Sequence, residues 1–215
     1  MDITILCSSE NHPVNSHLVE WKNRNSHHHN IELLREKAEM SGGDLLFLIS
    51  CTEILKLEDR QKYKKSLVIH ASNLPRGRGW NPHIWQIIEG KTTLCVTMLE
   101  AEDKVDSGAI WHQMNVDIPK HFLFDEINNA LFEVELSLMD FALKNFKSIV
   151  PREQPTDVQP TYYAKRSPSD SRVNPEQSIR SQFDLIRVCD PERFPAFFEL
   201  YGKKYVVKLE VFPDE

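Results

Sequence analysis

The chain has 215 residues, 40% of them hydrophobic, and carries a formal net charge of −6. This length supports a full hydrophobic core in one domain, or in one domain with a small appendage. The acidic balance and the absence of a Lys/Arg-rich run argue against a nucleic-acid partner, which normally needs a basic face. No apolar run approaches the roughly 18 residues of a membrane span, and the N-terminus lacks a secretory signal. We therefore expect a cytoplasmic protein with no membrane partner.

The first half of the chain alternates strand-like and helix-like patterns. In order, these patterns predict a strand over 3–7, a helix beginning at Pro13 or Asn15, a helix over 31–38 that ends at Ser41-Gly42-Gly43, and strands over 45–49 and 67–69. Such alternation favours an α/β fold with a mostly parallel sheet and helices on both faces.

The second half begins with the same alternation and then changes character. It predicts a helix over 82–90, strands over 94–99 and 109–116, and a long amphipathic helix over 123–146. Prolines then interrupt the pattern, so we divide the chain into a domain over 1–150 and a small accessory subdomain over 151–215. The subdomain is expected to hold a helix over 174–188 and a β-hairpin over 197–209 that turns at Gly202. The apolar hairpin suggests a homodimer surface.

Cysteine and histidine patterns give no metal site. The four cysteines are widely spaced without a CxxC pair, so we expect buried free thiols in a reducing compartment. The run from His27 to His29 is expected to be a solvated loop, because three consecutive side chains do not easily converge on one ion.

An acid/base pair is predicted from two strand ends. His70 closes the buried strand over 67–69, a Pro/Gly turn follows over 74–80, and Asp106 follows the next strand. Neighbouring parallel strands bring the loops at their carboxyl ends to one edge of a sheet, so we expect the imidazole and the carboxylate to meet there.

These segments resemble one family. Residues 69–75, IHASNLP, with Arg78-Gly79, resemble the histidine signature N-x-H-P-S-L-L-P-x-x-R-G of the 10-formyltetrahydrofolate-dependent formyltransferases. The segment from Asp103 to Gln113 is similar to the second signature of that family, D-x-G-x-I-x-x-Q. The resemblance covers about residues 1–150 and implies a Rossmann-like sheet with the folate held across the carboxyl ends of its strands.

The chain departs from this family at one position. An asparagine normally precedes the histidine by two residues, and Val68 occupies that place here. Its amide would donate to the formyl oxygen, so either Asn73, Ser72 or ordered water supplies part of the lost stabilisation here, or the rate is lower. Removing one such donor typically costs about 3 kcal/mol in the barrier. The rate would then be lower without being abolished.

The chemistry assigns roles to the remaining pair. Formyl transfer to an amine passes through a tetrahedral adduct with negative oxygen and positive nitrogen, so one charge must be stabilised and one proton removed. We expect His70 to stabilise the oxyanion, and Asp106 to orient His70 and relay the proton.

The resemblance also implies binding residues. For the co-substrate, N10-formyltetrahydrofolate, these are Glu53, Ile54, Leu55, Leu74, Asp103 and Gly108. The tail over 162–188 resembles that of sugar N-formyltransferases acting on nucleotide-linked amino sugars, and the His70–Trp80 segment is similar to their pseudaminic-acid-type branch, which implies a 4-amino-4,6-dideoxy hexosamine. Guanidinium groups clasp phosphate and aromatic rings stack on bases, so Trp80, Tyr163, Lys165 and Arg166 are candidates for the diphosphate and base, with Arg78 as a further substrate-binding residue. Equally, Arg166 would be a surface ion-pair partner and Trp80 a core residue. Asn11 and Asn15 near a helix N-terminus are either a second phosphate site or residues that only cap and turn the chain.

Two other functions fit the same residues. A hydrolase would use the pair to release formate from formyltetrahydrofolate with water as the acceptor. A non-catalytic folate-binding module would result if the site had decayed when Val68 replaced the amide donor.

Overall fold

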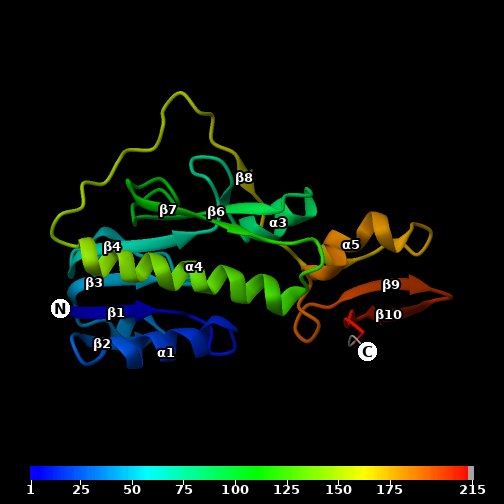
Figure 1. Cartoon of the computed structure of the whole chain (residues 1–215), viewed down its shortest axis with the longest axis horizontal. Helices are drawn as coiled ribbons and strands as arrows, with labels where there is room; N and C mark the ends of the chain where they lie inside the picture. The colour runs from blue at the N-terminus through cyan, green and yellow to red at the C-terminus, as the bar shows by residue number, and fades with distance from the viewer. Residues whose placement is uncertain (213–215) are drawn as a thin grey trace.

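A six-stranded sheet forms the centre of the molecule, with strand order β2-β1-β3-β4-β6-β7 (Figure 1). The computed structural model describes residues 1–212. The strands are β1 (Asp2–Leu6), β2 (Asn30–Leu34), β3 (Gly43–Leu48), β4 (Tyr63–His70), β6 (Thr93–Glu100) and β7 (Ile110–Asp117). The first four are mutually parallel, which confirms the mostly parallel α/β sheet.

The two faces of the sheet are covered differently. Side chains alternate along the strands, so Leu45 and Phe47 face the main core, whereas Leu46 and Leu48 face a smaller cluster. The main core packs against the helices α1 (Val14–Asn25), α3 (Pro82–Ile88) and α4 (Phe124–Asn145). The smaller cluster includes residues beside the short helices η1 (Lys37–Glu39) and α2 (Leu57–Arg60). Both faces therefore exclude water from the strands.

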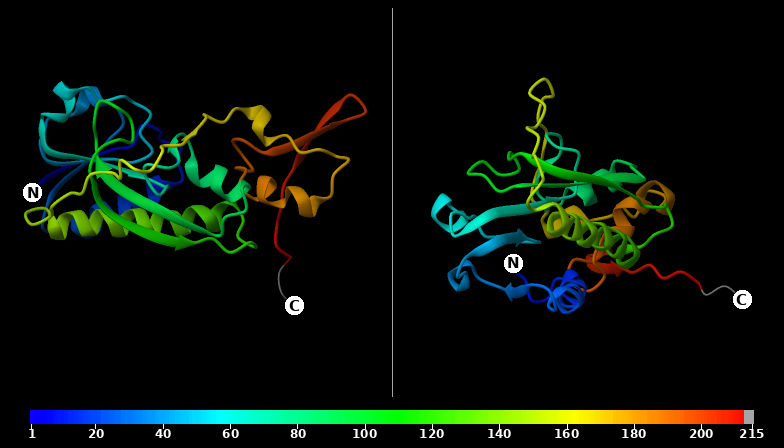
Figure 2. Two further views of the ribbon diagram at one scale, coloured as in Figure 1. Left: turned by 90° about the horizontal axis from the view of Figure 1, so that it is seen from above. Right: turned by 60° about the vertical axis from the view of Figure 1, so that its left-hand side comes forward.

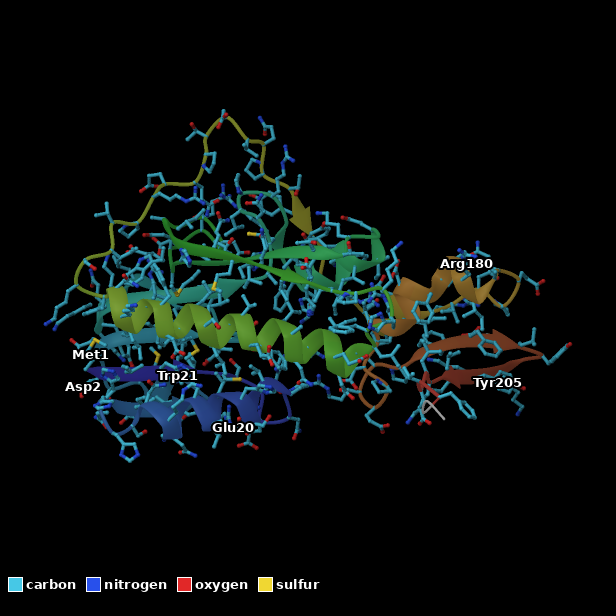
Figure 3. The ribbon with its side chains drawn as sticks, viewed as in Figure 1. Met1, Asp2, Glu20, Trp21, Arg180 and Tyr205 are labelled. Carbon is cyan, nitrogen blue, oxygen red and sulfur yellow. The ribbon has the colours of Figure 1, made fainter. Side chains whose placement is uncertain are left out.

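The two long helices on the main face are fastened to each other. Trp21 is fully buried and points from α1 toward α4, where its Nε1 donates to Asp140 at 2.6 Å (Figure 3). The predicted helix over 123–146 is confirmed almost to the residue. Its start is capped by Glu126, whose carboxylate accepts the Leu123 N–H at 2.9 Å.

The helix predicted over 31–38 is wrong. Residues Asn30–Leu34 instead form β2, an edge strand that pairs in parallel with β1, with Ile31 opposite Ile3. Ile31 and Leu33 face the main core, while Leu34 faces the smaller cluster. This period of two was hidden in a run too short to distinguish from helical spacing.

The expectation that parallel neighbouring strands bring His70 and Asp106 together is also wrong. Strand β6 runs antiparallel to β4, with His70 opposite Thr97 and Leu67 opposite Glu100. The carboxyl end of β6 therefore lies beside the middle of β4, not beside His70. Asp106 reaches His70 from the loop over 101–109, which connects β6 to the antiparallel β7.

After α4 the chain returns across the sheet as an extended strap, residues 150–163 (Figure 1). Arg152 and Ile110 form an antiparallel bridge at its start. At its end, β8 (Tyr162–Tyr163) pairs in parallel with β5 (Arg78–Gly79). The strap thus contacts both segments that carry the sequence signatures.

The C-terminal elements lie at the end of the molecule away from Met1 (Figure 2). They are η2 (Pro168–Ser171), α5 (Ile179–Arg187) and the hairpin of β9 (Ala196–Leu200) and β10 (Lys203–Val207). The hairpin prediction is confirmed, but the helix begins five residues later than predicted, because Ser178 caps it by accepting the Ser181 N–H. The guanidinium of Arg187 is fully buried and donates to the carbonyls of Pro119 and Phe122, which fastens α5 to the chain before α4.

Cys7 and Cys189 are buried as predicted, whereas Cys51 and Cys95 are only partly buried. All four cysteines are free thiols, and His27 and His28 are exposed in a turn. Within residues 1–212, no three or more His, Cys, Asp and Glu side chains are grouped to hold a metal ion. None of the helices described has the length and apolarity to cross a membrane.

Candidate active site

The structure brings His70 and Asp106 together in a buried position. Their side chains are 9% and 5% exposed, and His70 Nδ1 lies 3.6 Å from Asp106 Oδ1. The other ring nitrogen, Nε2, is 2.8 Å from the Gly77 carbonyl, which can only accept. The Nε2 proton is therefore fixed, and the Nδ1 of a neutral ring presents its lone pair toward Asp106.

Backbone groups of the first signature hold both members of this pair. Gly77 accepts from His70, and the Gly79 N–H donates to Asp106 Oδ2 at 2.9 Å. Both ring nitrogens are thus directed at acceptors, and two acceptors face each other across 3.6 Å. The space between Nδ1 and Oδ1 is therefore suited to receive a proton that the two groups share. With both ring nitrogens directed at protein acceptors, the geometry fits this role better than the predicted contact of His70 with a formyl oxygen.

The loop that carries Asp106 is tightly constrained. Asp106 has a φ of 56°, an unusual conformation for a residue with a side chain. Gly108, two residues later, passes so close to β6 that an added Cβ would collide with the Glu100 carbonyl oxygen. The position of the carboxylate therefore depends on the backbone around it.

We expect Gly108→Ala to displace this loop. A methyl group with no space forces a backbone shift, which typically costs about 1–3 kcal/mol. Urea denaturation would show the loss of stability, and Gly90→Ala is a contrasting variant, because a Cβ there meets nothing within 4 Å. Gly90 has a φ of 89°, so its variant reports conformational strain without collision. A Gly108→Ala variant as stable as the wild type would contradict this account of the loop.

The two candidate oxyanion donors differ in their freedom. Asn73 is exposed, and its Oδ1 accepts from Gln113 Nε2 at 3.2 Å, so its amide nitrogen points elsewhere. Gln113 is held in turn by Thr97 at 2.8 Å and by Arg152. Ser72 Oγ is buried without a hydrogen-bond partner among the described residues. Asn73 is therefore the accessible donor of the two.

Val68 faces an apolar surrounding. It packs against Leu74, Leu99 and Ile110, on the same face of β4 as His70 two residues later. The place of the absent asparagine is thus adjacent to the pair and is surrounded by hydrocarbon.

Five of the six candidate folate residues, all but Leu74, lie on two loops that one buried arginine joins. Arg60 is 7% exposed, and it donates to the Leu55 carbonyl at 2.8 Å and to Asp103 Oδ1 at 2.7 Å. Ile54 is 71% exposed beside this link. Arg60 was not predicted from the sequence, because an isolated arginine is normally expected on the surface.

Four of the folate candidates are committed to contacts within the protein. The side chains of Leu55 and Leu74 are buried in apolar clusters, and the Glu53 carboxylate accepts the Lys37 N–H at 2.7 Å. Gly108 contributes its carbonyl to a hydrogen bond from Gln154. Any contact of these residues with a pterin ring would use backbone atoms.

Four of the candidate substrate residues gather beside α3. Lys165 Nζ lies 4.7 Å above the Trp80 ring, and the Tyr163 ring stacks on Trp85 at 6.2 Å. The Arg166 guanidinium is 5.4 Å from the Trp85 ring. Trp80 directly follows Gly79, the backbone partner of Asp106, so this cationic and aromatic group borders the pair.

His83 of α3 is near enough to His70 and Arg166 for their charges to affect it. Burial, with smaller effects of the neighbouring His12, His70 and Arg166, lowers the pKa of His83 to about 4. Its ring is therefore neutral at pH 7. Burial, followed by the adjacent Glu89 carboxylate, raises the pKa of Tyr163 to about 12, which keeps the phenol protonated.

The side chains of Arg78 and Asn15, both substrate candidates, are engaged in hydrogen bonds within the protein. Arg78 is 6% exposed and donates to the buried Gln154 and to the exposed Tyr162, so it holds the strap against the first signature. The Asn15 amide donates to three carbonyls of its own loop, and its oxygen accepts from Arg35 at 2.7 Å. The Asn11 carbonyl accepts from Arg193.

Comparison with known proteins gives the same family as the two signatures. The formyl transferase family model matches residues 5–143. A methionyl-tRNA formyltransferase of Rickettsia bellii is 32% identical over 152 residues, which are 71% of this chain and 49% of that protein. The chain thus spans about half the length of this curated relative.

Solved structures support the fold. Methionyl-tRNA formyltransferase from Clostridium thermocellum has a TM-score of 0.81 at 21% identity, covering 95% of this chain and 90% of its own. A sugar N-formyltransferase from a Shewanella species has a TM-score of 0.72 at 18% identity, covering 100% and 99%. Because the family match extends over well more than half of the residues, the protein belongs to the formyl transferase family.

Proposed function

We propose that the protein transfers a formyl group from N10-formyltetrahydrofolate to the amine of a nucleotide-activated amino sugar, of the 4-amino-4,6-dideoxy hexosamine type. The observation that carries this proposal is the buried His70–Asp106 pair, held between two family signatures by Gly77 and Gly79. Neither member of the pair has the solvent exposure expected of an ordinary surface turn.

The pair would manage the proton of the reaction. Transfer joins the acceptor nitrogen to the formyl carbon, breaks the bond from that carbon to N10, and moves one proton from the acceptor nitrogen to N10. Asp106 Oδ1 and His70 Nδ1 face the same gap, so they would accept this proton and return it. The exposed Asn73 amide would donate to the developing oxyanion in place of the asparagine absent at Val68.

The charge of the chain favours a small acceptor. A net charge of −6 without a Lys/Arg-rich run is unsuited to a polynucleotide. The group formed by Trp80, Tyr163, Lys165 and Arg166 instead offers aromatic rings for a base and cations for a diphosphate. The fold likeness does not separate the two acceptors, because the Shewanella sugar N-formyltransferase covers 100% of this chain and the Clostridium thermocellum methionyl-tRNA formyltransferase covers 95% of it.

The test is an acceptor assay read by mass spectrometry. The protein is incubated with N10-formyltetrahydrofolate and either UDP- or dTDP-linked 4-amino-4,6-dideoxy sugars, or with methionyl-tRNA. We expect a mass gain of one formyl group on an amino sugar and none on the tRNA. If only methionyl-tRNA were formylated, the acceptor would be the tRNA and not an amino sugar. Folate turnover without any amine would identify a hydrolase.

A further inference from the structure

We propose that Gln154, which lies outside the segment that matches the family, is a positioning residue that holds Asp106 against His70. This inference rests on the proposed function for its catalytic meaning, but its structural part is independent. Gln154 is 9% exposed and belongs to the strap. No signal in the sequence marks it beyond the nearby prolines at 151 and 155.

The side-chain amide of Gln154 makes hydrogen bonds to two backbone carbonyls of the second signature. Its Nε2 donates to the Asp106 carbonyl at 2.9 Å and to the Gly108 carbonyl at 3.0 Å. Asp106 has a left-handed φ of 56°. Such conformations persist only when the surrounding structure enforces them. The Gln154 amide supplies such a constraint, because it donates directly to the Asp106 carbonyl.

The other end of Gln154 is anchored on the first signature. Its Oε1 accepts from Arg78 Nη2 at 2.7 Å. Arg78 is paired to the strap through its backbone, because its N–H donates to the Thr161 carbonyl at 2.9 Å. Thr161 Oγ1 also accepts the Gly77 N–H at 2.8 Å, and Gly77 is the residue whose carbonyl holds His70.

The strap therefore helps to fix the positions of both His70 and Asp106. One part holds Gly77 and thereby His70, and the other holds the carbonyl of Asp106. Because Asp106 Oδ1 approaches His70 to 3.6 Å without a direct hydrogen bond between them, their spacing depends on these outside contacts. A misplacement of about 1 Å can cost roughly 10²-fold in rate.

The variants Gln154→Glu and Gln154→Met separate anchoring from positioning. Glutamate keeps the acceptor for Arg78 but removes the donor to both carbonyls, whereas methionine removes both functions. The matched control is Gln182→Met, because Gln182 Nε2 also donates to loop carbonyls, those of Asn174, Gln177 and Ser178, far from the pair in sequence.

Amide hydrogen exchange at Gly79 gives a readout that needs no ligand. Its N–H bonds Asp106 Oδ2, so its protection reports whether the carboxylate stays in place. We expect both variants at position 154 to lower Gly79 protection at least about tenfold, the equivalent of one hydrogen bond. Protection of the Trp80 N–H, which bonds the Tyr163 carbonyl, is expected to be retained in Gln154→Glu. Gln182→Met is expected to change neither amide.

Kinetics complete the test with the acceptor that is formylated in the assay above. We expect Gln154→Glu to lower kcat by about 10–100-fold with a KM for the acceptor close to that of the wild type. Unchanged protection of the Gly79 amide in Gln154→Glu would overturn the proposal. An equal loss of protection at the Gly79 and Trp80 amides would overturn it too, because it would indicate general unfolding of the strap. If the wild type formylates none of the acceptors while Gly79 protection falls as expected, the positioning role stands and the proposed function fails.

Discussion

Asp106→Asn is expected to lower kcat by about 10²–10⁴-fold, the range typical for loss of a general acid–base group. Asparagine keeps an oxygen that can accept the Gly79 N–H, so the loop should stay in place. It removes the negative charge that faces His70 Nδ1, and with it the capacity to take up the proton of the amine. The measurement is steady-state kinetics with the formylated acceptor, which should show little change in KM.

A matched control distinguishes this effect from a general change of surface charge. Asp117 ends β7 and is exposed, and its Oδ1 accepts from Thr93 at 2.7 Å. Asp117→Asn removes the same charge away from the pair and should retain the wild-type rate. Wild-type turnover by the double variant His70→Asn/Asp106→Ala would show that the pair does not carry the reaction and would favour the non-catalytic alternative.

Glu135→Gln is expected to stabilise the protein at alkaline pH by several kcal/mol. Glu135 lies in α4, and its Oε2 is buried without a hydrogen-bond partner among residues 1–212. Burial raises the pKa of this carboxyl from 4.5 to about 8. The folded state therefore holds a proton that the unfolded chain releases near pH 4.5, so stability is complete below that pH and is lost as pH rises toward 8. Each pKa unit is worth about 1.4 kcal/mol, which gives a loss on the order of 3–5 kcal/mol above pH 8.

The difference between variant and wild type isolates this single group. Urea denaturation at pH 5, 7 and 9 should show an advantage of the Glu135→Gln variant that grows with pH, because the amide cannot ionise. Glu133→Gln is the control on the same helix, since that side chain is exposed. A Glu135→Gln variant that is less stable than the wild type at every pH would show that the carboxyl makes a contact of its own.

The sequence predicts the long elements and the identity of the pair, but not what holds the pair. Apolar spacing over 123–146 is long enough to define α4, whereas the five residues of β2 are not, and pairing with β1 decides their structure. The two signatures identify His70 and Asp106 even though β6 runs opposite to the expected direction.

Contacts of high sequence separation account for what was missed. Gln154 acts on residues 46 and 48 positions earlier, and Arg60 acts on Asp103, 43 positions later. Neither residue has a local pattern that marks it. Arg78 was predicted to bind substrate, but the fold buries it and its guanidinium donates to Gln154 and Tyr162. Composition does not reveal which charged side chains the fold will enclose.

The strap has a practical consequence for anyone dividing this chain. The family match ends at residue 143, before Arg152, Gln154 and Thr161. A fragment cut at that border would retain both signatures in full and yet leave the carbonyls of Asp106 and Gly108 and the amide of Gly77 without their partners. The segment that matches the family and the segment that holds His70 and Asp106 in place are therefore different stretches of polypeptide, and excision or grafting should begin from the larger one.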